Sequence, residues 1–272
     1  IKIMLKSLVK GKNIDYYFWR ILYVVVKPFS ILLSAHLLGS NIANLVSLAI
    51  IVSTTLMASL SFGSYRALLK TDADVNIRIF RKSLFLFNFL IIFSISIPIY
   101  YIEESYLSSY LFIVFFLITE HVGFDEARIK LYEGNRASWA FENFSRSLFI
   151  PVLVLIIYLF NGENYLVPMF SLFLVNMFVS RKRNGLFSQL RNAFISIFNG
   201  TGFFKFYFHQ INYFFTSIMS KLAQQSDRYF YTAFSYETLW VYTILSQIAS
   251  SVTMIYEMTI LSEMKSKVAK EK

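Results

Sequence analysis

The sequence predicts an all-α integral membrane protein with about eight transmembrane helices. The 272 residues are 56% hydrophobic and only 15% charged, whereas a soluble domain is about 25% charged. The apolar residues form long runs, and each run with its flanks approaches the ~20 residues that a helix needs to cross a bilayer. Connections rich in basic residues alternate along the chain with connections that have none, which is typical of a chain that crosses a membrane repeatedly.

The first four spans are predicted at 15–37, 42–66, 82–102 and 107–129. Three of them are built on the apolar runs Ile21–Val26, Leu84–Ile99 and Leu111–Ile118. The second span lies between a connection that lacks basic residues and one that is strongly basic. None of the runs alternates in polarity, which argues against membrane strands.

The last four spans are predicted at 138–160, 164–180, 206–228 and 235–261. The first two contain the runs Phe149–Phe160 and Tyr165–Val179, and the last two are apolar on all but one face. The long connection 181–205 combines several glycines with an apolar stretch at Phe194–Phe198. We interpret it as an interfacial helix that links two units.

The basic residues predict the orientation of the spans. They gather in 1–13, 66–82, 128–136, 181–205 and 262–272, and none lies in Leu37–Asn41, Glu103–Tyr106 or Asn161–Asn164. Basic connections stay in the cytoplasm. We therefore expect a multi-pass protein of the cytoplasmic (inner) membrane, in contact with membrane lipids, with both termini in the cytoplasm.

Composition also excludes several kinds of function. A net charge of +10 would suggest a nucleic-acid partner for a soluble protein, but orientation explains the excess here, so we expect no nucleic acid. Cysteine is absent, and His36, His121 and His209 lack metal-ligand spacing. No phosphate-binding loop or catalytic arrangement is recognisable. We expect neither an enzyme nor a metal or cofactor.

Five basic residues lie outside those cytoplasmic segments, all of them within or at the edge of predicted spans: Arg20, Lys27, Arg146, Lys221 and Arg228. A basic residue at mid-span costs about 2.5–3.5 kcal/mol on insertion scales, so each needs a partner or water. In the first span, polar residues recur every three or four positions, which places them on one face of a helix. They are Tyr16, Arg20, Tyr23, Lys27, Ser30 and Ser34.

The last two spans carry similar polar stripes. One consists of Gln210, Tyr213, Ser217, Lys221, Gln224 and Arg228, and the other of Tyr242, Ser246, Ser250, Thr253 and Glu257. These stripes either line a water-filled cavity or act as polar contacts between helices. Lys27 lies near mid-span beside Pro28, which favours the cavity.

Three of the cations have alternative structural interpretations. Arg20 and Arg228 lie near enough to span ends to reach the headgroups. Arg146 follows Glu142 by four residues, a spacing that predicts a local ion pair. In the fourth span, His121, Asp125, Arg128 and Tyr132 share a face. That set is either a proton or cation relay, to which Glu257 is a candidate addition, or a neutralised cluster near the cytoplasmic end.

Two stretches resemble the oligosaccharide and polysaccharide flippases (Wzx-type, polysaccharide-synthesis transporters), of the superfamily that includes the MATE multidrug exporters. Leu37–Leu45 with Ser61–Lys70 is similar to the first two helices of that family, and Gln225–Phe230 with Leu239–Tyr242 to the seventh and eighth. Ala43-Asn44 replaces the aromatic-glycine pair that members usually carry. The other segments agree in hydropathy and loop charge.

The resemblance implies a two-lobe fold of which this chain would form only a part. Members have twelve to fourteen helices in two six-helix lobes. Residues 1–204 would then form an N-terminal MATE-like lobe of six helices with a cytoplasmic linker, and 205–272 the first hairpin of a second, truncated lobe. We therefore expect an incomplete, N-terminal part, which alone does not transport.

The resemblance also implies a function by alternating access. A polyprenyl-diphosphate-linked oligosaccharide would cross the cytoplasmic membrane through a cationic cavity, for surface polysaccharide or O-antigen synthesis. The residues expected to bind the headgroup are Lys27, Arg20, Tyr23, Lys221, Arg228 and Arg146. The candidates for ion coupling are Asp125, His121 and Glu257. A polysaccharide polymerase or chain-length machinery would be a partner. The alternatives are a MATE-type drug exporter, which should prefer an acidic, aromatic cavity, and a membrane scaffold that does not transport.

Overall fold

The computed structural model describes residues 14–60, 83, 86–88, 90–102, 104–132, 136–160, 166–171, 195 and 201–256. Every element in these ranges is helical. The all-α class is thus confirmed for the described part of the chain. The elements are α2 (Ile14–Leu38), α3 (Ser40–Leu60), α5 (Ser96–Ile102), α6 (Glu104–Tyr132), α7 (Arg136–Ser147), α8 (Phe149–Leu159), α11 (Thr201–Gln224), α12 (Ser226–Phe234), the 3-10 turn η2 (Tyr236–Thr238) and α13 (Leu239–Tyr256).

Within the described ranges, two helical stretches are long and apolar enough to cross a membrane, by length and composition. They are Asp15–Leu38, which is α2, and Arg136–Leu159, which comprises α7 and α8. Ser40–Leu56 and Tyr106–Glu120 are shorter apolar helices. The number of eight transmembrane helices therefore stays a prediction.

Gly39 alone separates α2 from α3. Its φ of +83° lies in the left-handed region, which glycine adopts without the steric cost that a Cβ imposes, and such residues commonly terminate helices. The Gly39 carbonyl accepts a hydrogen bond from the Ala43 amide at 3.2 Å, so α3 begins at once. The connection predicted at Leu37–Asn41 is thus a one-residue turn.

The structure changes two of the predicted spans. The span 138–160 keeps a helical backbone at Leu148 (φ −63°, ψ −18°) and comprises α7 and α8, which are separate elements because Pro151 has no amide proton for the carbonyl four residues earlier. The span 206–228 ends as α11 at Gln224, and α12 starts at Ser226 after Gln225 leaves the helical region (φ −115°, ψ 8°). No glycine or proline marks this second break in the sequence.

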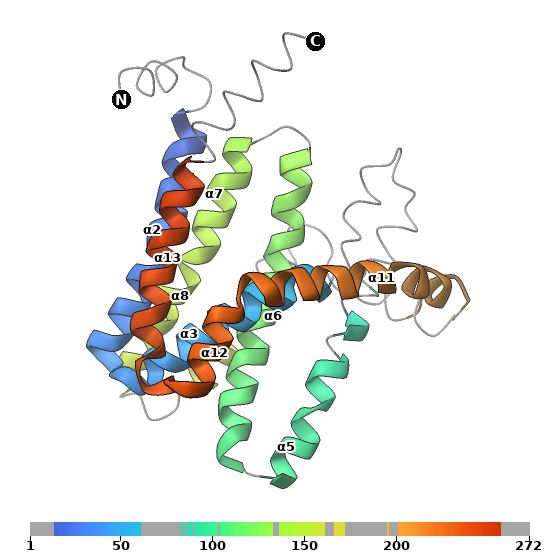
Figure 1. The fold of residues 1–272 in the computed structure, drawn as a ribbon, viewed down its shortest axis with the longest axis horizontal. Coiled ribbons are helices and arrows are strands. Elements are labelled where there is room, and N and C mark those ends of the chain that lie inside the picture. The colour runs from blue at the N-terminus through green and yellow to red at the C-terminus, as the bar shows by residue number, and fades with distance from the viewer. Residues whose placement is uncertain are drawn as a thin grey trace.

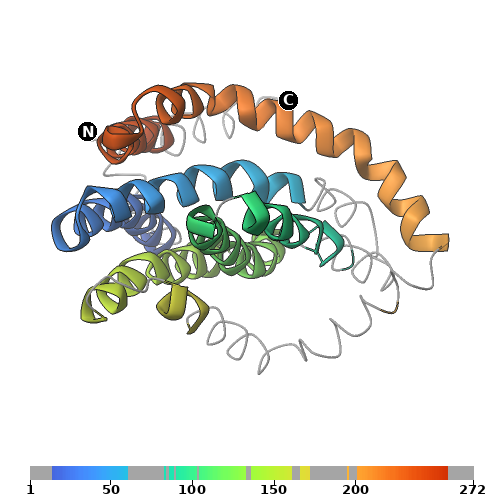
Figure 2. The ribbon, with the colours of Figure 1, turned by 90° about the horizontal axis from the view of Figure 1, so that it is seen from below.

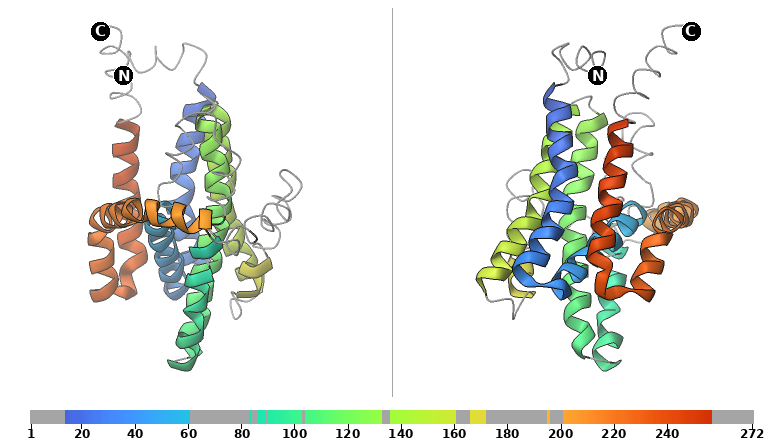
Figure 3. Two further views of the ribbon diagram at one scale, coloured as in Figure 1. Left: turned by 90° about the vertical axis from the view of Figure 1, so that its right-hand side faces the viewer. Right: turned by 60° about the vertical axis from the view of Figure 1, so that its left-hand side comes forward.

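The helices do not all run in the same direction. α2, α6, α7 and α13 stand upright in Figure 1, whereas α3 and α11 run across them. α11 packs along α3, and Figure 2 shows the two side by side. α13 packs on α2 and α3, with α2 and α13 both upright in Figure 3. The segment that follows residue 200 therefore contacts the first two helices directly.

The ends of the upright helices lie at two opposite ends of the molecule. The start of α2, the end of α6, the start of α7 and the end of α13 lie at the top in Figure 1. The α2–α3 turn, the end of α5, the start of α6 and η2 lie toward the opposite end.

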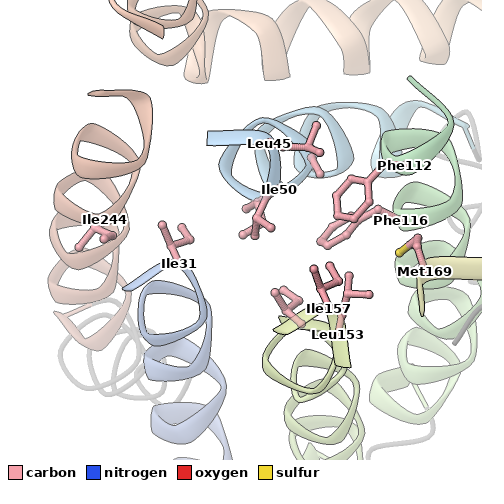
Figure 4. Packing of buried hydrophobic residues seen from close by; sticks show 12 residues of the cluster. Ile31, Leu45, Ile50, Phe112, Phe116, Leu153, Ile157, Met169 and Ile244 are labelled. Carbon is pink, nitrogen blue, oxygen red and sulfur yellow. The ribbon is translucent and has the colours of Figure 1, made fainter. Parts of the chain in front are cut away.

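The core lies where α2, α3, α6, α8 and α13 meet (Figure 4). Its fully buried side chains include Ile31 of α2, Ile50 of α3, Phe116 of α6 and Ile157 of α8. Ile244 of α13 belongs to the same cluster. Outside the core, many large apolar side chains are exposed on the described helices.

Candidate functional site

α2 places its polar side chains toward the other helices and its apolar side chains outward. Ser30 and Ser34 are fully buried, and their hydroxyls donate to the carbonyls of Val26 and Ser30 one turn earlier. The opposite face is exposed and carries Phe18, Ile21, Val25, Phe29 and Leu32, each about half exposed at 47–54%. This arrangement reverses that of a water-soluble amphipathic helix, whose polar face is the exposed one.

Lys27 lies opposite a carboxylate of α6. Its Nζ is 4.0 Å from Oε2 of Glu120, and the two side chains are 12% and 11% exposed. The same Nζ lies 5.5 Å from the centroid of the Tyr23 ring. Lys27 is therefore neutralised across helices, and the carboxylate comes from a residue that sequence reasoning did not select. The signal was present, since Glu120 is an acidic residue within the predicted span 107–129.

Arg20 lies one helical turn from Tyr23 and is held by aromatic rings. Its guanidinium carbon lies 4.7 Å from the centroid of the Trp139 ring and 5.3 Å from that of Tyr23. The Trp139 ring is itself stacked with the ring of Tyr16, and the two centroids are 6.2 Å apart. Within the described part of the chain, Arg20 has no ion pair or hydrogen bond, and its Nε is buried without an acceptor. Trp139 was also missed by sequence reasoning, because aromatic contacts between helices leave no spacing signal.

Arg146 forms the local ion pair that its spacing predicts. Its Nη2 lies 3.8 Å from Oε2 of Glu142 on the same face of α7. Glu142 is 8% exposed. This ion pair neutralises Arg146 within its own helix, as the structural interpretation requires.

Lys221 and Arg228 lie on two different helices. Lys221, near the end of α11, donates to Oε1 of Gln224 at 2.9 Å. Arg228, on α12, is 6% exposed, and its Nη2 lies 3.5 Å from Oγ of Ser250 on α13. The prediction that one helix presents both cations on one face is wrong, because α11 ends before Arg228. No ion pair or hydrogen bond among the described residues joins either cation to Arg20 or Lys27.

The surroundings of Arg228 tie α12 to its neighbours. Asp227 accepts a hydrogen bond from the Tyr242 hydroxyl at 2.5 Å. Tyr231 stacks on the Tyr242 ring with centroids 4.4 Å apart. The Tyr229 hydroxyl donates to Thr55 of α3 at 2.8 Å. The polar residues of α12 therefore hold the turn between α11 and α13 in place.

The candidate coupling residues cannot be placed in the site. His121 and Asp125 belong to α6, but their side chains lie outside the described residues, and Glu257 lies beyond the last described residue of α13.

Comparison of the chain with protein-family models, curated proteins and solved structures gives no match. The function is therefore argued from the site itself. That site consists of Arg20, Tyr23 and Lys27 of α2, Glu120 of α6 and Trp139 of α7, and we call it the α2 cation site.

Proposed function

We propose that this chain is a multi-pass protein of the cytoplasmic membrane that takes part in the translocation of polyprenyl-diphosphate-linked oligosaccharide for surface polysaccharide synthesis. It belongs, on this proposal, with the Wzx-type flippases. About eight helices cross the membrane, and both termini face the cytoplasm. The oligosaccharide crosses as the headgroup of a lipid, and the polyprenyl tail of that lipid stays in the bilayer.

The two faces of α2 support membrane insertion. Burial of apolar area is favourable by about 25 cal/mol per Å², and a soluble protein would gain that by turning Phe18, Val25 and Phe29 inward. In this structure they point outward, about half exposed, while Arg20 and Lys27 are partly buried among other helices. A hydrocarbon surrounding accounts for both observations, since it accepts apolar side chains and excludes charges.

The positions of the helix ends support the orientation. The ends that adjoin the basic segments before α2, between α6 and α7, and after α13 share one end of the molecule (Figure 1). The turn at 37–41 and the start of α6 at 104–106, which hold no basic residues, lie at the other end. The positive-inside rule puts the first end in the cytoplasm.

The α2 cation site supports an anionic cargo, and this is the observation that carries the proposal. Its described side chains hold two cations and one carboxylate, so one positive charge has no counter-ion among them. A diphosphate supplies the missing negative charge, and arginine and lysine are the side chains that bind phosphate oxygens. A drug exporter would use the same aromatic rings to hold an organic cation. Here Arg20 and Lys27 already occupy the faces of Trp139 and Tyr23.

The proposal is tested by deleting the gene from the organism that encodes it. We expect loss of surface polysaccharide and accumulation of the lipid-linked precursor on the cytoplasmic leaflet, both reversed when the gene is restored. A deletion that leaves polysaccharide normal and instead raises sensitivity to cationic drugs would favour the exporter. Normal precursor distribution and normal drug tolerance would favour the scaffold.

A further inference from the structure

The ion pair between Lys27 and Glu120 is long for a buried pair. Charge-assisted N–H···O hydrogen bonds are about 2.7–2.9 Å, whereas Nζ and Oε2 are 4.0 Å apart. Both side chains are nearly nine-tenths buried, and no hydrogen bond among the described residues satisfies the Glu120 carboxylate. The pair therefore incurs the cost of desolvation without the short contact that normally compensates it.

Arg20 and Lys27 share the ring of Tyr23. Both cationic groups lie within 5.5 Å of its centroid, whereas among the described residues Glu120 forms an ion pair with Lys27 only. Arg20 has no hydrogen bond and no ion pair among the described residues, and its Nε is buried. A planar guanidinium whose Nε donor is buried and unused fits an anion with several oxygens.

We infer that Glu120 is a displaceable counter-ion. A diphosphate group binds to Arg20 and Lys27 beside Tyr23, and the Glu120 carboxylate then gives up Lys27. The inference rests on the proposed function for the identity of the ligand. It adds that Glu120 competes with the diphosphate for Lys27. Since Glu120 belongs to α6 and Lys27 to α2, ligand binding removes the ion pair that joins these two helices.

Competition predicts an unusual pair of effects for Glu120→Gln. Without ligand, the nearly buried Lys27 side chain loses its carboxylate partner in this variant, so the protein should unfold at a lower temperature. With ligand, no carboxylate has to be displaced, so the diphosphate should bind more tightly. A carboxylate with a purely structural role would give the first effect without the second.

The experiment measures binding to the purified 272-residue chain in detergent by isothermal titration calorimetry. The probes are farnesyl diphosphate and inorganic pyrophosphate, with farnesol as the control without phosphate. For Glu120→Gln we expect the Kd for farnesyl diphosphate to fall about tenfold, within the usual range for coupling between competing groups. Arg20→Gln should raise the Kd at least about tenfold, since a charged hydrogen-bond donor is lost. Glu142→Gln removes the other paired carboxylate described near the site, and its Kd should stay within about twofold of the unmodified protein.

The outcomes separate the inference from the proposed function. Equal Kd values for the unmodified protein and Glu120→Gln, with Arg20-dependent binding in both, overturn the displacement and leave the function standing. Binding of neither diphosphate by either protein overturns both. If pyrophosphate binds as tightly as farnesyl diphosphate, the displacement is supported, but the site does not recognise the lipid tail. If Glu120→Gln does not fold, Glu120→Asp replaces it, because the shorter side chain weakens the pair and should lower the Kd by an intermediate factor; an unchanged Kd in that variant also overturns the displacement.

Discussion

Asn44 on α3 caps the start of α13 through Trp240. The Asn44 Oδ1 accepts a hydrogen bond from the backbone amide of Trp240 at 3.0 Å, and its Nδ2 donates to the carbonyl of Glu237 at 3.1 Å. Asn44 is 1% exposed. The side chain therefore satisfies a donor and an acceptor at the helix start. In the sequence, Asn44 stood out only as a departure from the flippase pattern.

The cap predicts that Asn44→Ala destabilises the protein by about 1–2 kcal/mol. The reason is that the Trp240 amide and the Glu237 carbonyl lose their partner at a buried position. Asn44→Asp keeps the acceptor and adds a negative charge at a helix N-terminus, so it should recover part of the loss. Denaturant unfolding of the purified protein measures both changes. An aspartate variant as unstable as the alanine variant would show that capping is not the role of Asn44.

Gly39→Ala should destabilise the α2–α3 turn through the backbone alone. A Cβ at this position would meet no atom within 4 Å, and φ is +83°, so the cost is that of a left-handed residue, about 1–2 kcal/mol. Gly39→Asn should cost less, because asparagine tolerates this conformation better than alanine does. The ranking is measured as the free energy of unfolding. Equal losses for the two variants would contradict the backbone explanation.

Val25→Lys decides whether the exposed face of α2 lies in lipid. Val25 is 53% exposed in the middle of α2. In hydrocarbon, a central lysine costs about 2.5–3.5 kcal/mol, whereas an exposed position in water tolerates it within about 0.5 kcal/mol. We expect the variant to lose resistance to carbonate extraction from membranes. Asp15→Lys, at the exposed start of the same helix, is the matched control and should stay integrated; a Val25→Lys protein that stays folded and extraction-resistant would argue against lipid contact.

Lys27 is predicted to serve both stability and function, and a double variant separates the two. Lys27→Met leaves Glu120 without its cation and should cost about 3 kcal/mol, near the low end for a broken buried pair because the pair is long. Lys27→Met with Glu120→Gln removes both charges and should regain most of that stability. In cells, the protein level should recover in the double variant while surface polysaccharide stays absent. Lys27→Arg should retain part of the surface polysaccharide, because the positive charge is kept. Normal polysaccharide in the double variant would exclude Lys27 from the function.

The predicted orientation is tested with single cysteines, since the chain has none of its own. Arg136 begins α7 and Glu237 lies in η2, and both side chains are exposed. Under the positive-inside rule, an impermeant thiol reagent should label Cys at position 237 in intact cells. It should label Cys at position 136 only after the cells are permeabilised. The reverse pattern would invert the topology.

Local patterns predicted which side chains lie together within α2 and within α7. The recurrence of polar residues every three or four positions in 16–34 follows from the helical period, and in the structure Arg20 and Lys27 both approach the ring of Tyr23. The ion pair between Glu142 and Arg146 follows from the same period. The break at Gln225 was not predictable in this way, because the residue is not a known helix breaker and tertiary contacts such as that of Tyr229 with Thr55 hold the new direction.

The helical class, the polar face of α2 and a connection at Leu37–Asn41 could be predicted from the sequence, because each depends on residues within a few positions of one another. The fold was needed to show that Glu120 faces Lys27, that Trp139 covers Arg20 and that Asn44 caps α13. These contacts join residues that are far apart in the chain, and they exist because α2 and α6 both pack on α7 while α13 packs on α3. Helix packing depends on how whole surfaces fit together, and no local spacing encodes which two helices meet.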